Sequence, residues 1–289
     1  MILRYDEHIE DFLKQTEEIL LLEEAKNQLM LHNAWHLCGK PTSMDHVFGT
    51  VSTKDGRMVL AFLNMPPYNM TLANLGHAAK SEVVHLAEDL VNKNIHIQGV
   101  NAEEPFALWF ASAYGNRKNV HASLKLSMEI LELKKLSTVK LPDGIFRKAS
   151  MEDLRTITDM TVSFALEALN EVVEFKDALL KNEERIRDGK FYIFEVDGNI
   201  VSLAMRSRQL KNGAAISMVY ADSTKRNNGY GLAVTYHLCE KMLAEGLSFV
   251  TLFVDKRNPV SNRVYEKIGF IAVSGNNDYR FVGKEEKEK

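Results

Sequence analysis

The stretch VYADSTKRNNGYG, residues 219–231, joins a predicted strand at residues 215–220 to a predicted amphipathic helix. Gly229 and Gly231 lie where that helix begins, so backbone N–H groups can approach an anion there without side chains in the way. The helix dipole adds partial positive charge at the same point, and Arg226 adds a full charge. The stretch therefore predicts a binding site for a phosphate or a diphosphate.

The glycine loop alone leaves two other interpretations open. One is a tight turn that binds no ligand. The other is a dinucleotide-binding βαβ unit of an oxidoreductase, because Gly229-x-Gly231-x-x-Val234 is followed by an apolar strand that ends at Asp255. Three observations count against the oxidoreductase: Val234 replaces the third glycine, eight residues separate the first strand from Gly229, and only 34 residues follow Asp255.

A second stretch, LFVDKRNPVSNRVYEKIGF at residues 252–270, predicts a strand followed by a short helix. Asn258 is a good N-cap, Pro259 suits the first helical position, and Gly269 can end the helix in the left-handed conformation. The stretch therefore contains a complete set of start and stop signals for one helix.

The spacing within this short helix predicts an apolar side and a polar side. At about 100° per residue, three residues fall within one sector and are expected to face the core: Val260, Val264 and Ile268. Asn258, Asn262 and Tyr265 cluster on nearly the opposite side. Such a face is either solvated or presents two amides and a phenol to a ligand.

The two stretches together resemble the signature segments of the GNAT superfamily of N-acetyltransferases. Arg226-x-x-Gly229-x-Gly231 matches that family's R/Q-x-x-G-x-G/A loop, and the segment from Asn258 to Phe270 matches its YEKIGF segment, in the same order and at the same spacing. The resemblance covers about residues 143–283 and is nearest to a bacterial group with a degenerate N-terminal acetyltransferase-like half. It implies an α/β (α+β) fold: a mixed β-sheet, flanked by helices, that opens around acetyl-CoA.

The resemblance also implies roles for individual residues. The backbone at Val219 would polarise the thioester carbonyl, the amine would attack directly, and Tyr265 would protonate the departing thiolate. The cofactor-binding residues it implies are Met218, Val219, Tyr220, Arg226, Asn227, Asn228, Gly229, Tyr230, Gly231, Asn258 and Asn262.

A general base is needed if the amine arrives protonated. Four carboxylates are candidates: Glu167, Glu171, Glu195 and Asp222. We take Glu167 as the catalytic one, although a carboxylate on a helix such as 153–172 is more often simply solvated. His237 is expected to be structural. The other histidines show no metal-ligand spacing, so no metal is expected.

The polar segment KKLSTVKLPDG, residues 134–144, marks a boundary between a domain at 1–140 and a catalytic domain at 141–289. His85-Leu86 and His237-Leu238 lie 152 residues apart within similar patterns, so two related tandem domains are one interpretation and chance is the other. The first domain has a single glycine in its corresponding loop, so it is not expected to bind the same ligand. Within it we also expect a strand at 95–100 and a helix at 123–133.

Composition narrows the class of protein. The chain has 289 residues, a net charge of −3 and no apolar run near the ~20 residues that span a bilayer, so nucleic acid and membrane partners are not expected. Two cysteines and an acidic, periodic N-terminus favour a cytoplasmic protein. We expect an N-acetyltransferase acting on a small-molecule or peptide amine, with homodimer formation left open. The alternative is a non-catalytic acyl-CoA-binding regulatory protein.

Overall fold

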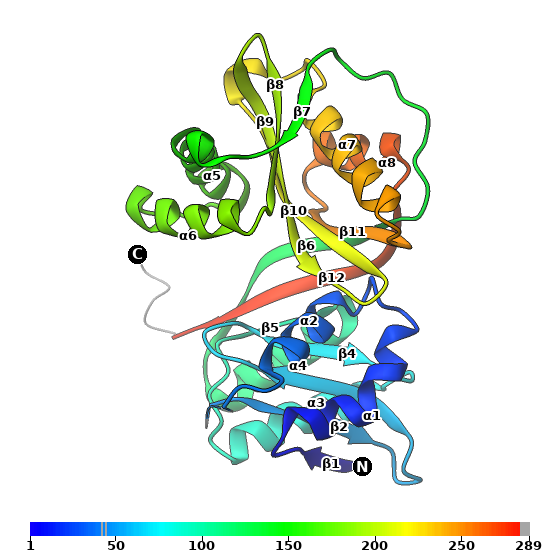
Figure 1. Cartoon of the computed structure of the whole chain (residues 1–289). Helices are drawn as coiled ribbons and strands as arrows, with labels where there is room; N and C mark the ends of the chain where they lie inside the picture. The colour runs from blue at the N-terminus through cyan, green and yellow to red at the C-terminus, as the bar shows by residue number, and fades with distance from the viewer. Residues whose placement is uncertain (42, 44, 284–289) are drawn as a thin grey trace. The chain divides into compact units, whose positions relative to one another are not determined.

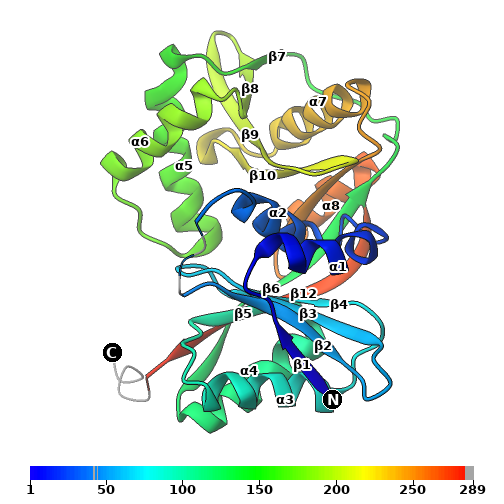
Figure 2. The ribbon, with the colours of Figure 1, turned by 60° about the horizontal axis from the view of Figure 1, so that its bottom comes forward.

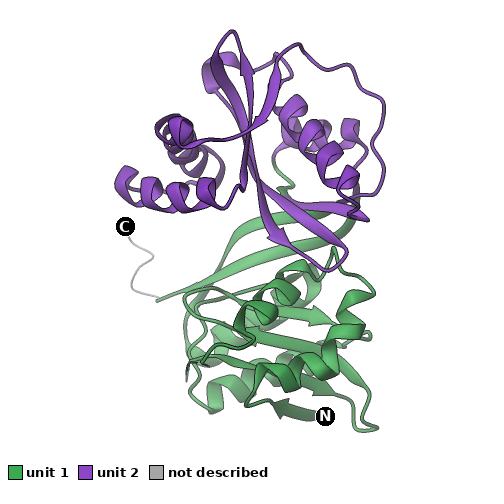
Figure 3. Cartoon of the chain, viewed as in Figure 1, with its two compact units in different colours: residues 1–130, 254–257, 272–289 green, residues 131–253, 258–271 purple. Residues whose placement is uncertain are grey.

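The computed structural model describes residues 1–41, 43 and 45–283. The chain divides into two compact units (Figure 3). Unit 1 comprises residues 1–130, 254–257 and 272 onward, and unit 2 comprises residues 131–253 and 258–271. Among the described residues, no helix is both long enough and apolar enough to cross a membrane.

Unit 1 is a mixed sheet covered on both faces. Its strands lie in the order β1-β2-β3-β4-β5-β12-β6, and only β4 and β5 among the registered pairs run parallel. Helices α3 and α4 pack on one face and α1 and α2 on the other (Figure 2). The elements are β1 (Ile2–Tyr5), α1 (Ile9–Leu21), α2 (Gln28–Leu37), β2 (Val47–Ser52), β3 (Met58–Asn64), β4 (Met70–Asn74), α3 (Lys80–Asn92), β5 (Gly99–Glu103), α4 (Glu104–Lys118) and β6 (His121–Leu133).

Unit 2 has the order β11-β10-β9-β8-β7, and here β10 and β11 run parallel. Its main core lies where α5 and α6 pack on β8, β9 and β10 (Figure 1). The elements are β7 (Ile145–Lys148), α5 (Leu154–Leu169), α6 (Phe175–Arg187), β8 (Phe191–Val196), β9 (Asn199–Gln209), β10 (Gly213–Ala221), α7 (Tyr230–Ala244), β11 (Phe249–Asp255) and α8 (Pro259–Ile268), and the chain then returns to unit 1 as β12 (Ile271–Val282). The mixed sheet flanked by helices confirms the predicted fold class.

The chain runs twice through one order of elements, β-α-α-β-β-β-α-β-α-β. His85 lies in α3 and His237 in α7, the corresponding helices, so the 152-residue offset follows the repeat. Two related domains are therefore the structure of this chain. The last strand of each copy is β6 or β12, and here the division of the sequence into two consecutive halves differs from the pairing of the strands.

Strand β12 comes from the end of the chain but pairs antiparallel with β5, from Asn276 opposite Glu103 to Arg280 opposite Gly99. The compact units therefore do not coincide with residues 1–140 and 141–289, because the C-terminal strand has its ladder partner in unit 1. The consecutive division stays a prediction about the repeat in sequence.

Two predicted elements of unit 1 are wrong. Residues 123–133 form strand β6 rather than a helix, and the alternation of Leu124, Leu126 and Met128 with polar residues is the period of a strand. The strand predicted at 95–100 begins only at Gly99. The preceding residues are extended but held by a side chain, since the Tyr114 hydroxyl accepts from the N–H of Ile97 (3.0 Å) and donates to the carbonyl of Ile95 (3.1 Å).

The start of α5 is fixed by a capping arrangement between Ser150 and Asp153. The Asp153 carboxylate accepts a hydrogen bond from the Ser150 N–H at 2.7 Å. It also accepts a bidentate pair of hydrogen bonds from the Arg147 guanidinium, at 2.8 and 2.9 Å. These contacts connect β7 to the helix that carries Glu167. The hydrogen bond from Arg147 is the largest cause that lowers the pKa of Asp153, ahead of burial, which opposes it.

Asp153→Asn is expected to lower the free energy of unfolding by about 1.5–3 kcal/mol at neutral pH, the usual worth of hydrogen bonds to a charged group. Because the folded-state pKa is lowered, this stability is present above the ordinary aspartate pKa of about 3.9 and is lost as the pH falls through the folded-state value. Urea unfolding at pH 7 and pH 3 measures both. Asp159→Asn, an exposed aspartate on the same helix, is the control, and equal effects of the two variants would contradict the assignment.

Candidate active site

Strand β10 separates from β11 partway along its length. The parallel ladder joins Gly213–Ala215 to Phe249–Thr251, and in the described residues its register goes no further. Beyond that point β10 has a bulge toward β9, where Met218 adopts φ 52° and the pairing shifts between Ser217 and Tyr220. The edge of β10 that faced β11 therefore has backbone groups available to pair with an extended ligand.

The loop after β10 leads into a helix start that no side chain caps. The Asp222 carboxylate accepts from the Thr224 N–H at 2.9 Å and so holds the turn at Ser223–Lys225. Gly229, at φ 79°, is the N-cap of α7 and gives no side-chain cap to the helix. The first N–H groups of α7 therefore lack intrahelical acceptors and face outward, as an anion site requires.

Gly231 leaves open space beside the backbone at this helix start. A Cβ atom built on Gly231 would meet only the Cβ of Ala221, at 4.0 Å. The protein itself therefore gives no steric reason for glycine at a helical position where glycine costs roughly 1 kcal/mol. Close approach of a ligand to the backbone supplies that reason.

Glu167, Tyr220 and Arg226 come together beside the loop. The Arg226 guanidinium donates to Glu167 and lies over the Tyr220 ring, 5.5 Å from its centre. The Tyr220 hydroxyl donates to the other Glu167 oxygen at 2.8 Å. The hydrogen bond from Arg226 lowers the pKa of Glu167, so this carboxylate is ionised at neutral pH and accepts a proton weakly.

Helix α8 begins and ends at the predicted residues. The Asn258 side chain accepts from the Ser261 N–H at 3.1 Å, Pro259 is the first residue of the helix, and Gly269 follows it at φ 111°. The Asn262 amide donates to the Asn258 carbonyl at 2.8 Å. The side-chain oxygen of Asn258 therefore caps the helix. Its NH₂ group is the part of the side chain that could donate a hydrogen bond to a ligand.

The predicted sides of α8 are partly wrong. Ile268 is buried, but Val260 is 71% exposed and Tyr265 is only 7% exposed. Tyr265 and Ile268 are three residues apart and share a face, and helix α8 packs against α7. Burial follows from the position of α7, which helical spacing alone does not contain.

Burial changes the chemistry of Tyr265. Desolvation, with a smaller effect from Cys239, raises the pKa of the Tyr265 hydroxyl well above its ordinary value. The hydroxyl makes no hydrogen bond to another described residue, and it is not one of the fully buried polar atoms that lack a partner. A protonated, unpartnered hydroxyl is well suited to donate to a ligand atom.

The other predicted bases are engaged elsewhere or solvated. Glu195 accepts from Arg147 at 2.9 Å, and the contacts with Thr224 lower the pKa of Asp222. Glu171 is exposed. His237 stacks on the Phe194 ring with centres 6.2 Å apart, which agrees with a structural role. In the described part of the chain, no group of three or more His, Cys, Asp or Glu could hold a metal ion.

In unit 1, side chains of the protein accept hydrogen bonds from the backbone N–H groups of the corresponding loop, between β4 and α3. The Asn74 carboxamide oxygen accepts from the N–H groups of Gly76, His77 and Ala78 at 3.3, 2.9 and 3.4 Å. The Glu82 carboxylate accepts from the Ala79 N–H at 2.9 Å. The donors that α7 leaves open are thus occupied at the start of α3.

Sequence reasoning missed the Met218 bulge, the pairing of Glu167 with Arg226 and the self-capped loop of unit 1. The first two depend on contacts between distant segments and leave no local signal. The third had one, because asparagine before a loop often accepts from backbone N–H groups two to four residues later.

The comparisons with known proteins concern the family and the fold. Residues 156–270 match the family model described as the acetyltransferase (GNAT) family. No curated protein matches the chain in sequence. A GCN5-related N-acetyltransferase from Sphaerobacter thermophilus is similar in structure, with 15% identity, a TM-score of 0.60 and coverage of 92% of this chain and 92% of that chain.

Two further solved structures cover almost all of the chain. A Drosophila protein has 13% identity and a TM-score of 0.63, covering 97% of this chain and 98% of its own. A tandem GNAT protein from the clavulanic acid biosynthesis pathway has 14% identity and a TM-score of 0.54, covering 96% and 98%. At these identities the likeness concerns the fold, and it extends over both units of the chain.

The fold and the family match both agree with the acetyltransferase class that the sequence motifs predict. Residues 156–270 match the acetyltransferase (GNAT) family model, so this segment is similar to an N-acetyltransferase domain of that family. Transfer of an acetyl group from acetyl-CoA is the general reaction of that family.

Proposed function

We propose that the protein transfers the acetyl group of acetyl-CoA to a primary amine by direct attack, without an acetylated enzyme intermediate. The observation that carries the proposal is the uncapped start of α7 at Gly229 and Gly231 in the same unit as the unpartnered hydroxyl of Tyr265. Backbone groups from Arg226 to Gly231 would hold the diphosphate, and β10 at Met218–Tyr220 would hold the pantetheine arm. When bound, acetyl-CoA supplies an activated thioester.

In this proposal the backbone of β10 and the phenol of α8 do the chemical work. The N–H at Val219 donates to the carbonyl oxygen as negative charge develops there. The Tyr265 hydroxyl, kept protonated by its raised pKa, gives its proton to the leaving sulfur. The NH₂ groups of Asn258 and Asn262 would bind the cofactor arm.

Glu167 is the proposed acceptor of the amine proton. Its oxygens contact Tyr220 and Arg226, so it lies beside the strand that would hold the thioester. Since Arg226 lowers its pKa, we propose that it takes a proton from an amine that has already begun to form its new bond, when that proton is most acidic.

We further propose one cofactor site per chain, because Asn74 and Glu82 cap the corresponding loop of unit 1. The two cysteines, Cys38 and Cys239, are unpaired, in keeping with the proposed cytoplasmic setting. The acceptor would be a small-molecule or peptide amine. Homodimer formation remains part of the proposal to be tested.

The experiment is an assay of free thiol release from acetyl-CoA with a panel of primary amines that includes polyamines, amino acids, aminoglycosides and peptides with a free N-terminus. We expect saturable thiol release with at least one class, and mass spectrometry should show one added acetyl group on that amine. Protein that binds acetyl-CoA by calorimetry, yet releases no thiol with any amine, would favour the non-catalytic acyl-CoA-binding alternative.

A further inference from the structure

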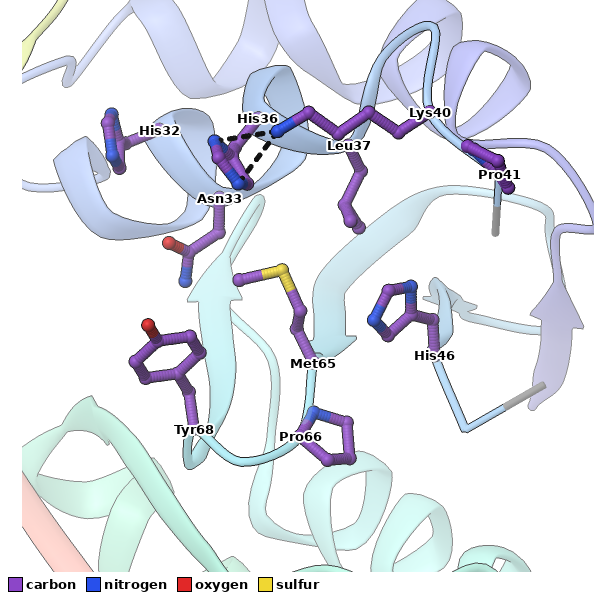
Figure 4. Close-up of a pocket in the computed structure, with 10 residues that line it drawn as sticks. All are labelled: His32, Asn33, His36, Leu37, Lys40, Pro41, His46, Met65, Pro66 and Tyr68. Atoms are coloured by element: carbon purple, nitrogen blue, oxygen red, sulfur yellow. Dashed lines mark hydrogen bonds between the residues drawn. The ribbon is translucent and has the colours of Figure 1, made fainter. Parts of the chain in front are cut away.

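A pocket of unit 1 is lined by residues that the acetyltransferase proposal does not use. Its volume is about 360 Å³, near the lower end of ligand pockets, which range over roughly 300–1,000 Å³. Helix α2 forms one side of it, and the ends of β3 and the segments before β2 and β4 form the other (Figure 4). None of these segments contributes to the site proposed for acetyl-CoA.

The pocket combines an apolar floor with polar walls. Leu37 and Met65 are 6% and 8% exposed and supply the floor. Figure 4 shows the Asn33 carboxamide and the Tyr68 hydroxyl pointing toward each other beside Met65. A ligand here would therefore need both an apolar part and a hydrogen-bonding part.

The ammonium group of Lys40, at the edge of this pocket, has N–H donors that His36 does not use. Its ammonium nitrogen lies 2.8 and 3.2 Å from the two ring nitrogens of His36, and within the described residues it has no other polar contact. A neutral imidazole accepts through one nitrogen only, whereas an ammonium group has three N–H donors. At least two donors of Lys40 are therefore available to a ligand.

His46 adds a further donor from the opposite side. Its Nδ1 accepts from the backbone N–H of Ser43 at 3.3 Å, so the neutral ring carries its proton on Nε2. Figure 4 shows this ring turned toward the space beside Leu37 and Met65. The donors of Lys40 and His46 thus approach the pocket from different segments of the chain.

The positive charge here has no carboxylate to balance it. Among the described residues that line the pocket, none is acidic. Glu10 accepts from the Gly39 N–H at 3.2 Å, and Glu17 accepts from the Trp35 ring N–H at 2.6 Å, so each of these two carboxylates has a partner outside the pocket. A protein with net charge −3 therefore holds an unbalanced cation beside an apolar floor.

We propose that this pocket binds a small organic anion, a carboxylate or phosphate group attached to an apolar body. The anionic group accepts from Lys40, His46 and the donors of Asn33 and Tyr68, as charge-assisted hydrogen bonds. The apolar body lies on Leu37 and Met65. The pocket is a second ligand site, separate from the start of α7.

Calorimetric titration of the full chain tests this with phenyl phosphate, benzoate and neutral benzyl alcohol, each in the presence of saturating CoA so that the start of α7 is filled. We expect saturable binding of an anionic probe and none of benzyl alcohol, and the tighter of phenyl phosphate and benzoate identifies the anionic group. Lys40→Met should weaken that binding about tenfold or more, and His46→Gln should weaken it less. Lys211→Met, at an exposed lysine of unit 2, is the matched control and should bind as wild type.

Three results would overturn the proposal. Absence of saturable binding by both anionic probes is the first. Equal affinity of Lys40→Met and wild type is the second, provided that circular dichroism shows both to be folded. Binding that is saturable in a second titration without CoA but absent in saturating CoA is the third, because the probe would then occupy the start of α7. Failure of the amine assay leaves this test intact, since no arm of it measures acetyl transfer.

Discussion

Tyr265→Phe is expected to lower kcat for acetyl transfer by about 100-fold or more, the lower end of what a positioned general acid contributes, and to leave the affinity for acetyl-CoA unchanged. The substitution removes one hydroxyl that has no partner among the described residues. The ring that packs against Phe270 stays. Folding should therefore be preserved, and the loss should appear in the chemical step alone.

Steady-state kinetics with the best amine of the panel, together with calorimetric binding of acetyl-CoA, measure the two quantities separately. Tyr236→Phe is the control, because Tyr236 lies in α7 and, within the part of the chain that the structure describes, its hydroxyl has no hydrogen-bond partner. If Tyr265→Phe keeps wild-type kcat, another group protonates the thiolate. If it loses acetyl-CoA affinity instead, Tyr265 is a binding residue.

Helix α8 shows what sequence could and could not predict. Its boundaries were predicted because caps are local chemistry: Asn258, Pro259 and Gly269 act on backbone groups within a few residues. The burial of Tyr265 was not predicted because it depends on which surface of α7 lies opposite. A helical wheel gives the angle between side chains but not the direction of the core.

Strand β6 is the reverse case, where the signal was present and the wrong period was chosen. Leu124, Leu126, Met128 and Ile130 alternate with polar residues, the spacing of a strand, although Leu124 itself is exposed. The partner strands of β6 and β12 could not be predicted. A strand that ends a repeat has the same pattern whether it completes its own copy or pairs with β5, as β12 does.

In the candidate site, too, the features set by local sequence were predicted, and those set by contacts between distant segments were not. The loop from Arg226 to Gly231 was predicted from its glycines and the following helix, because the physics of a helix start is local. The partner of the Arg226 side chain was not, since Glu167 lies 59 residues earlier. That contact lowers the pKa of the carboxylate chosen as base, so the structure restricts a role that the sequence had left open.

Gly231→Val is expected to weaken acetyl-CoA binding by about 1–3 kcal/mol, or roughly 5- to 150-fold in Kd, the usual cost of forcing extra methyl groups into an occupied space. Gly231 is the second residue of α7, so its N–H is one of the free donors of the helix start. A Cβ there meets nothing of the protein nearer than 4.0 Å. The new methyl groups therefore fall where the diphosphate would lie.

The stability of this variant separates a lost ligand contact from a damaged fold. Without a ligand, Gly231→Ala should be as stable as wild type or more so, by up to about 1 kcal/mol, because alanine favours a helix over glycine. Its acetyl-CoA affinity should fall less than that of Gly231→Val, because it adds only Cβ. Thermal unfolding and calorimetry on the three proteins measure this order. Wild-type affinity in Gly231→Val would place the diphosphate away from α7, and a large loss of stability in both variants would mean that glycine serves the fold rather than the ligand.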